Sequence, residues 1–465
     1  MTDTTVDRAQ DRATAHLRPA AHFTARDTWL NDPNGLVLHD GTWHLFFQNN
    51  PHGATHGNMS WGHATSDDLV SWTEQPVAIR HTATEEIFSG SAVVDEKNTA
   101  GFAGPGQTAL VAVYTSAYRP AHPTLAGRQA QSLAYSLDDG RTWTRYAGNP
   151  VLDRGSADFR DPKVFWYDGE DGEGHWVMVA VEATDRQVVM YRSADLKHWE
   201  HLSTFGPAHA TGGVWECPDL FPLPVRGTRR TRWVMIVSLN PGGVAGGSGA
   251  QYFVGDFDGT TFTPERPGDG PHGADWLDHG RDYYAPVSFN GVSDGRRLTV
   301  GWASNWDYAN ETPTSPWRST MSLARELTLV RTSDGRDRVA QRPVLPEEAR
   351  EGLSVHELRL PADGRRRHEI VLHGDGPDEV VLTVDAAART LVSDRRRSGD
   401  TAFHPAFPSV DTAPLHDVGE TVDVTVVVDG CVLEVYACGG LTTLTQVVFP
   451  TAPLTQVAVR ETTAG

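Results

Sequence analysis

A short motif recurs along the first half of the chain and constrains the fold more than any other feature of the sequence. Its clearest copies span residues 66–72, 136–143 and 193–199, and a weaker copy spans residues 255–262. Each copy follows a segment rich in β-branched and aromatic residues, then places an acidic turn before a closing aromatic ring. The closing rings lie 56 to 71 residues apart, a spacing that fits one four-stranded unit with long loops.

The rest of the first 342 residues agrees with repeated β-units. Short strand-like segments at 42–48, 108–115, 175–181 and 232–238 are separated by Gly, Pro, Asn and Asp, and helical periodicity is nearly absent. A further strand-rich unit spans residues 283–330. The chain is therefore predicted to be all-β, with a five-bladed β-propeller over residues 16–342.

The pattern changes after this region. Residues 343–352 contain Pro, Glu and Arg and no strand pattern, so we expect a linker. Alternating strands follow at 355–360, 369–372, 380–384 and 422–428, and Asp429-Gly430 makes a hairpin turn into residues 432–436. The sequence predicts a C-terminal β-sandwich over residues 353–465, with no concentration of reactive groups.

Three carboxylates stand at equivalent places in the repeats. Asp32, Asp161 and Glu216 each lie one or two residues before a proline, ahead of an apolar strand, and 38 to 46 residues before a closing aromatic ring. Asp-Pro and Asn-Gly are ordinary turn sequences, but turns alone do not explain three carboxylates in register with the repeats. Because the first strand of each propeller blade lines the central channel, we expect the three to meet at one mouth of it.

Converging carboxylates repel one another, so some must have shifted pKa values. Glycoside hydrolysis uses such a set, with one carboxylate attacking the anomeric carbon and a second giving its proton to the leaving oxygen. We expect Arg160 to keep Asp161 ionised, and Trp215 to desolvate Glu216 and favour its protonated form.

Several motifs resemble those of glycoside hydrolase family 32, which contains invertases, inulinases and levanases. They are residues 29–36, 88–91, 160–162, 216–219 and 301–306, and the resemblance covers nearly the whole chain. It implies a five-bladed propeller followed by a β-sandwich. Residues 246–255 and 305–308 look like the microbial inulinase and levanase branch, and aspartate at position 32 favours exo-action.

The resemblance also implies roles for individual residues. Asp32 would be the nucleophile, Glu216 the acid/base, and Asp161 the group that holds sugar hydroxyls and stabilises the transition state. The residues expected to shape the fructose pocket are Asn31, Gln48, Trp61, Phe88, Ser89, Arg160, Tyr283 and Trp302. The implied enzyme is a retaining β-fructosidase that releases terminal β-D-fructofuranosyl residues from fructans or sucrose-like oligosaccharides.

Composition narrows the choice of partner. The 40 Lys and Arg residues against 60 Asp and Glu give a formal net charge of −20, which disfavours nucleic acid and anionic membranes and suits a neutral sugar. Three cysteines cannot form a disulfide framework. The polar first 18 residues carry no visible secretory signal, so we expect a cytoplasmic enzyme, or a secreted one if a leader precedes this sequence, acting as a monomer.

Other interpretations remain open at this stage. His52, His56 and His63 lie close together, but glycines among them indicate a loop, so we expect no metal and no cofactor. A fructosyltransferase would use the same intermediate, and a non-catalytic fructan-binding protein would share the fold. A five-bladed arabinan-cleaving hydrolase is a further alternative. The preference for β-2,1 or β-2,6 linkages, and exo- or endo-action, depends on loops at the rim of the pocket.

Overall fold

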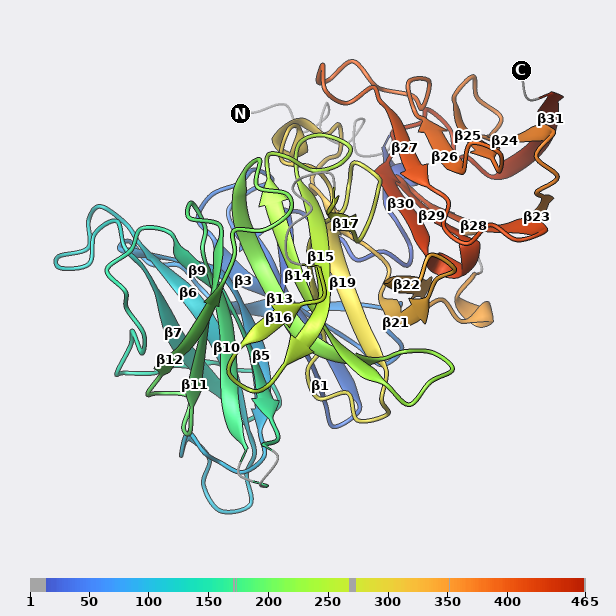
Figure 1. Cartoon of the computed structure of the whole chain (residues 1–465). Coiled ribbons are helices and arrows are strands. Elements are labelled where there is room, and N and C mark those ends of the chain that lie inside the picture. The colour runs from blue at the N-terminus through green and yellow to red at the C-terminus, as the bar shows by residue number, and fades with distance from the viewer. Residues whose placement is uncertain (1–13, 170–171, 173, 267–272, 351, 464–465) are drawn as a thin grey trace, which may run out of the picture.

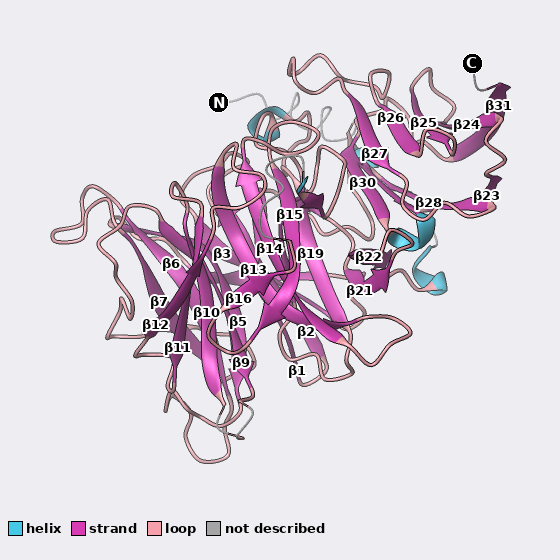
Figure 2. Ribbon diagram, viewed as in Figure 1, coloured by secondary structure: helices cyan, strands magenta, loops and turns pink. Residues whose placement is uncertain are grey.

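The computed structural model describes residues 14–463, apart from residues 170–171, 173, 267–272 and 351. The described chain is almost entirely strand and loop (Figure 2). Five sheets, blue to yellow in Figure 1, form a propeller, and two later sheets in orange and red form a β-sandwich beside it. The predicted fold class is therefore confirmed. No described helix is both long and apolar enough to cross a membrane. The short 3₁₀ turns are η1 (Ala15–Leu17), η3 (Ala309–Glu311), η4 (Glu347–Arg350) and η5 (Cys438–Gly440).

Each propeller sheet is an antiparallel meander in chain order. The first contains β1 (Trp29–His39), β2 (Thr42–Asn50), β3 (Ser60–Ser66) and β4 (Thr73–Ile79). The second contains β5 (Glu85–Asp95), β6 (Ala109–Tyr118), β7 (Gln129–Ser136) and β8 (Thr144–Arg145), and the third β9 (Phe159–Tyr167), β10 (His175–Glu182), β11 (Gln187–Ser193) and β12 (Glu200–Phe205). The fourth contains β13 (Val214–Pro224), β14 (Thr231–Asn240), β15 (Gly249–Phe257) and β16 (Phe262–Pro264), with β17 (Asp275–Trp276) paired to β15. The fifth contains β18 (Tyr284–Ser288), β19 (Arg297–Ala303), β21 (Arg325–Arg331) and β22 (Asp337–Pro343), with β20 (Thr320–Met321) paired to β19.

The first strands of the five sheets close a ring. Strand β1 contacts β5, β5 contacts β9, β9 contacts β13, β13 contacts β18, and β18 returns to β1. The first strand of each blade therefore lines the central channel, as the sequence predicted. The fifth blade extends beyond the predicted unit of 283–330, because its outermost strand, β22, ends at Pro343.

The repeated motif forms the connection between the third and fourth strands of a blade. In the first copy the Ser66 hydroxyl accepts the backbone N–H of Leu69 at 2.9 Å, and Asp68 accepts the N–H of Val70 at 2.8 Å. The closing ring then returns to the turn, since Nε1 of Trp143 and of Trp199 donates to a turn carbonyl in its own blade. These turns recur because short polar side chains satisfy the backbone groups that the reversal leaves unpaired.

The core of the propeller lies between neighbouring blades. Strands of the second and third blades share one hydrophobic cluster that includes Val113 and Trp176, and those of the third and fourth blades share another that includes Val179 and Phe253. Fully burying one such aliphatic side chain contributes about 1.5–3 kcal/mol. This packing fixes the first strands and so the channel.

The two later sheets pack as a sandwich around alternating Val, Leu and Ile side chains. One sheet contains β23 (Ser354–Pro361), β28 (Thr421–Asp429), β29 (Val432–Ala437) and β30 (Thr442–Val447). The other contains β27 (Val410–Pro414), β26 (Thr390–Asp394), β25 (Glu379–Asp385), β24 (Arg366–His373) and β31 (Gln456–Thr463).

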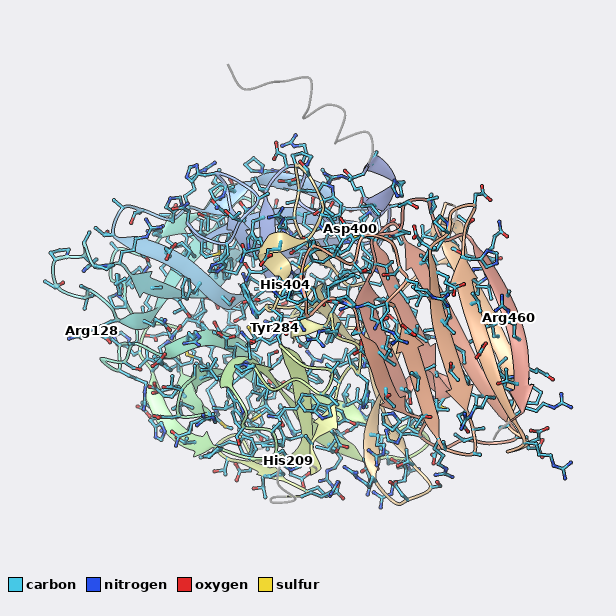
Figure 3. The ribbon with its side chains drawn as sticks, turned by 90° about the horizontal axis from the view of Figure 1, so that it is seen from above. Arg128, His209, Tyr284, Asp400, His404 and Arg460 are labelled. Atoms are coloured by element: carbon cyan, nitrogen blue, oxygen red, sulfur yellow. The ribbon has the colours of Figure 1, made fainter. Side chains whose placement is uncertain are left out.

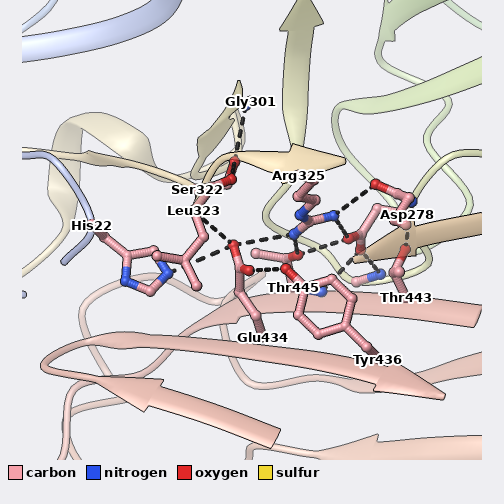
Figure 4. Close-up of polar contacts among 12 residues, drawn as sticks. His22, Asp278, Gly301, Ser322, Leu323, Arg325, Glu434, Tyr436, Thr443 and Thr445 are labelled. Carbon is pink, nitrogen blue, oxygen red and sulfur yellow. Dashed lines mark hydrogen bonds and ion pairs between the residues drawn. The ribbon is translucent and has the colours of Figure 1, made fainter. Parts of the chain in front are cut away.

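A buried ionic network joins the sandwich to the propeller (Figure 4). Arg325 of β21 binds Asp278 at 2.9 Å and Glu434 of β29 at 3.1 Å, and all three side chains are buried. Burial opposes ionisation, but Arg325 and His22 hold the pKa of Glu434 at about 2. A second buried pair joins Arg395 of the sandwich to Asp282, just before β18, at 2.6 Å.

Candidate active site

A β-bulge interrupts the first strand of every blade at the same level of the channel. The pairing with the second strand shifts between Leu30 and Pro33, Phe88 and Gly90, Arg160 and Lys163, Glu216 and Asp219, and Tyr284 and Val287. A bulge turns the side chain beside it out of the regular alternation and is common next to active sites. The five bulges form a ring that contains all three predicted carboxylates.

Proline or glycine fixes each bulge locally. Prolines follow Asp32, Asp161, Cys217 and Ala285, and Gly90 follows Ser89. Asp161, Cys217 and Ala285 have φ of 62°, 47° and 50°, a left-handed backbone that non-glycine residues rarely adopt. Such strain is held by the surrounding structure and gathers at functional sites.

The two carboxylate oxygens of Asp32 differ in their hydrogen bonding. Its Oδ2 accepts the Ser89 hydroxyl at 2.8 Å and lies 3.7 Å from Sγ of Cys217. Its Oδ1 is buried and has no hydrogen-bond partner among the described residues. Burial raises the pKa of Asp32 to about 6, the Glu216 carboxylate adds to the rise, and the hydrogen bond from Ser89 opposes it.

Asp161 is buried beside Sγ of Cys217, the sulfur that also lies near Asp32. Its Oδ2 accepts the backbone N–H of Cys217 at 3.0 Å. Burial raises the pKa of Asp161 to about 7, and the Glu216 and Asp32 carboxylates add to the rise. Arg160, 4.0 Å away, favours the ionised form of Asp161 and so acts in the expected direction, but it does not cancel the rise in pKa.

Glu216 is held by two donors from neighbouring blades. Arg160 donates to its Oε1 from Nη2 at 3.0 Å and from Nε at 3.2 Å, and the Tyr284 hydroxyl donates to its Oε2. Trp215 was expected to desolvate this carboxyl, but its ring is buried in the cluster between the third and fourth blades. That expectation is wrong because successive strand residues face opposite sides of the sheet.

Gln48 and Trp61, two of the expected pocket residues, donate hydrogen bonds to the backbone of the second blade. The Gln48 amide donates to the carbonyl of Ile87 at 3.0 Å, and Nε1 of Trp61 donates to the carbonyl of Phe88 at 3.0 Å. Both side chains are buried. They hold the bulge that carries Phe88 and Ser89. Asn31, in the first bulge, accepts the indole N–H of Trp29 at 2.7 Å.

Tyr283 does not lie with the other expected pocket residues. Its ring packs under the Arg325 guanidinium at 4.1 Å, facing the sandwich, while the next residue, Tyr284, reaches Glu216. In a view from above, Tyr284 lies near the middle of the molecule (Figure 3). The sequence carried a signal for this residue, since Tyr284-Ala285-Pro286 repeats the spacing of Glu216-Cys217-Pro218.

An aromatic group lies beside Tyr284. Trp302 is fully buried, and its ring centroid lies 6.3 Å from Tyr284 and 4.8 Å from Trp306. Trp306 is partly exposed and also contacts His56, at 5.2 Å between centroids. Trp306 is therefore a better candidate for an exposed pocket wall than Trp302, and the prediction omitted it.

The bulge ring gives this chain an acidic site of the kind that glycoside hydrolases use. The family description "Glycosyl hydrolases family 32 N-terminal domain" matches residues 22–343, and "Glycosyl hydrolases family 32 C terminal" matches residues 327–465. The chain belongs to glycoside hydrolase family 32, whose members similar to it act on fructans or sucrose.

Its relatives span bacteria and fungi. It is 45% identical to a levanase of Bacillus subtilis over 93% of this chain and 66% of the levanase, and 42% identical to an extracellular exo-inulinase of Aspergillus niger over 92% of this chain and 89% of that protein. The crystal structure of the Aspergillus awamori exo-inulinase matches with a TM-score of 0.85 and 38% identity, covering 97% of this chain and 96% of that one. The fructofuranosidase of Schwanniomyces occidentalis, complexed with fructose, also matches with a TM-score of 0.85, at 33% identity over 97% of this chain and 96% of that one.

Proposed function

We propose that this protein is a retaining β-fructosidase that hydrolyses terminal β-D-fructofuranosyl residues of fructans or sucrose-like oligosaccharides. Its relatives include a levanase and exo-inulinases, and one related structure contains fructose. These relatives are named for different fructans. The proposal therefore specifies the terminal β-D-fructofuranosyl residue and does not single out one polymer.

The different settings of Asp32 and Glu216 carry this proposal. Oδ1 of Asp32 has no partner and is free to attack, while Ser89 and Cys217 hold Oδ2. Both oxygens of Glu216 accept hydrogen bonds from Arg160 and Tyr284, which hold the carboxyl group in one orientation for proton transfer. One carboxylate is thus set as a nucleophile and the other as an acid/base.

The reaction proceeds in two displacements. Glu216 gives its proton to the glycosidic oxygen while Oδ1 of Asp32 bonds to the anomeric carbon, and the bond from that carbon to the leaving oxygen breaks. Glu216 then takes a proton from water, whose oxygen bonds to the anomeric carbon and releases Asp32. The sum is one fructoside and one water giving fructose and the free alcohol, with the configuration retained.

The remaining residues of the ring would hold the sugar. Asp161 and Asn31 lie beside the nucleophile in the bulges and would bind fructose hydroxyls, and Arg160 orients Glu216. Phe88 and Trp306, both partly exposed, would cover the faces of the ring. Trp302 would support that wall from its buried position.

Product analysis tests the proposal. Purified protein is incubated in parallel with sucrose, inulin and levan, and products are followed by chromatography and by NMR of the first anomer released. We expect free fructose as the only monosaccharide released from a polymer. It should appear first as the β-anomer. Longer products from sucrose would indicate a fructosyltransferase, and short oligosaccharides from a polymer would indicate endo-action. An absence of product from all three substrates would favour a non-catalytic fructan-binding protein.

A further inference from the structure

A cavity lies at the end of the channel strands opposite the carboxylates. The three carboxylates lie near the beginnings of the first strands, at Asp32, Asp161 and Glu216. The cavity, of about 640 Å³, is lined by the ends of the same strands, including Phe165 and Phe221. At about 3.3 Å per strand residue, Phe165 lies roughly 13 Å along β9 from Asp161. This volume is within the usual range for a small-molecule site.

Two cations meet at the wall of this cavity. Nζ of Lys163 and Nη1 of Arg297 each lie 3.4 Å from the hydroxyl oxygen of Ser288. Lys163 also donates to the carbonyl of Ser288, and Nη1 of Arg297 to the carbonyl of Phe289 at 3.4 Å. The Lys163 side chain is 5% exposed. Arg297 lies over the Phe221 ring at 5.0 Å, and its buried Nε has no hydrogen-bond partner among the described residues.

Inside the cavity wall, the two cations face one carboxylate, Asp219. Asp219 is the carboxylate beside the pair, 3.4 Å from Lys163, and it is already held by the backbone N–H groups of Leu220 and Ser288. Within the described part of the chain, no carboxylate lies within ion-pair distance of Arg297. Burial lowers the pKa of Arg297 and of Lys163, and Asp219 raises both pKa values without cancelling that effect. Arg297 is partly buried and has no carboxylate of its own, which is costly for a cation, so an incoming negative charge would be favoured here.

We propose that this cavity binds a small oxyanion, a phosphate group carried by a compact organic body, on Arg297 and Lys163. The guanidinium offers planar paired donors to a phosphate, and the lysine adds a point charge. Trp166 and Trp233, both partly exposed, provide apolar walls for the body of the ligand. The exposed rim residues Glu96, Lys97 and Asp168 lie in solvent, where salt screens their charges.

Calorimetric titration of the full chain tests this site. The probes are inorganic phosphate and phenyl phosphate at constant ionic strength, with phenol as the neutral counterpart of the second probe. We expect saturable binding of both phosphates at one site per chain, tighter for phenyl phosphate, and no binding of phenol alone. Removing one charged donor should weaken phosphate binding about tenfold or more in Arg297→Gln, and Arg297→Lys should retain part of it.

Matched variants separate the site from general electrostatics and from misfolding. Lys97→Gln removes a cation from the rim, where its ammonium lies over Trp166 at 4.2 Å, and should bind phosphate as the parent does. Circular dichroism and fructan hydrolysis should match the parent in Arg297→Gln, because the carboxylate ring is at the other mouth. No saturable phosphate binding by the parent, or equal binding by Arg297→Gln, would overturn the proposal. Equal loss in Lys97→Gln would show that only diffuse charge attracts the anion, and would also overturn it.

Discussion

The Tyr284 hydroxyl donates a hydrogen bond to Oε2 of Glu216, so the fifth blade holds a carboxyl that the fourth blade carries. Burial and the neighbouring Glu216 raise the pKa of Tyr284 well above its usual value. The phenol therefore stays protonated across the physiological range and remains a donor. Arg160 of the third blade binds the other oxygen, so three blades fix one side chain.

We predict that Tyr284→Phe lowers kcat about tenfold to a hundredfold with a smaller change in KM. The phenylalanine keeps the ring but removes one donor that orients the proposed acid/base, and positioned proton transfer contributes about 10²–10⁴-fold in total. Steady-state kinetics on the best substrate provide the measurement. Tyr283→Phe is the matched control, because that neighbouring ring packs on Arg325 and should leave kcat within about twofold. Equal losses in both variants would remove Tyr284 from the proposed site.

Asp32→Ala and Glu216→Gln should each lower kcat by several orders of magnitude while the protein stays folded. Loss of general acid/base catalysis alone accounts for about 10²–10⁴-fold. Azide separates the two roles, since it attacks without needing a general base. In Glu216→Gln it should intercept the fructosyl-enzyme with retention, and in Asp32→Ala it should attack the substrate directly with inversion. Near-parental turnover in either variant, with circular dichroism unchanged, would contradict the assignment.

Asp161 should destabilise the folded protein at neutral pH. Its pKa is about 7 when folded, against an ordinary value of 3.8, so the folded state binds this proton more tightly than the unfolded chain does. The stability that the proton provides is complete below about pH 3.8 and is lost as pH rises through about 7. Asp161→Asn abolishes this titration and tolerates the left-handed backbone, so its free energy of unfolding should exceed the parent's by on the order of 2 kcal/mol at pH 8.

Denaturant titrations at pH 4 and pH 8 check the sign. The two proteins should be nearly equal at pH 4, where the parent carboxyl is protonated, and activity should be lost at both values. Asp68 is a control of opposite sign, because hydrogen bonds in the repeated turn lower its pKa despite some burial. Asp68→Asn should therefore lose stability at pH 8. A decrease for Asp161→Asn at pH 8 would show that the carboxylate is stabilising there.

The fold could be predicted from the sequence because each repeated turn requires particular residues that are close together in the chain. Each turn between the third and fourth strands needs its own short polar side chains, so the motif around Asp68 and Trp72 recurs in several copies. The number of copies indicates the number of blades. The proline beside Asp32 and Asp161 likewise records a bulge in a channel strand. Features set by residues adjacent in sequence were therefore readable without a structure.

Contacts between blades could not be predicted from the sequence in this way. Whether Tyr283 or Tyr284 faces the channel depends on one residue of register, and a single-residue shift reverses the face of a strand. The partner of Arg160 is another case, because Glu216 is distant in sequence and Asp161 is adjacent. The paired cations Lys163 and Arg297 gave no sequence signal, since their proximity arises only when the third and fifth blades close the ring.

A chain that ends at Arg342 should be insoluble or inactive. Two hydrophobic clusters contain residues of both domains, and one packs Trp317 of the propeller with Phe407 and Phe449 of the sandwich. Removing the sandwich would expose this surface, which favours aggregation. Size-exclusion chromatography and fructose release provide the measurements. A soluble, fully active fragment would refute a supporting role for the sandwich.

The buried pair of Arg325 and Glu434 should couple the two domains energetically. Replacing Arg325 with Met leaves Asp278 buried without this cation and Glu434 with His22 alone, which costs about 3–5 kcal/mol. Adding Glu434→Leu removes one of those charges, so the double variant should be less destabilised than the two single changes combined. Because the pKa of Glu434 falls from 4.5 to about 2 on folding, its contribution is complete above pH 4.5 and is lost toward pH 2. Unfolding titrations of the four proteins at pH 7 and pH 3 measure both effects, and additive losses at pH 7 would mean that the pair does not couple the domains.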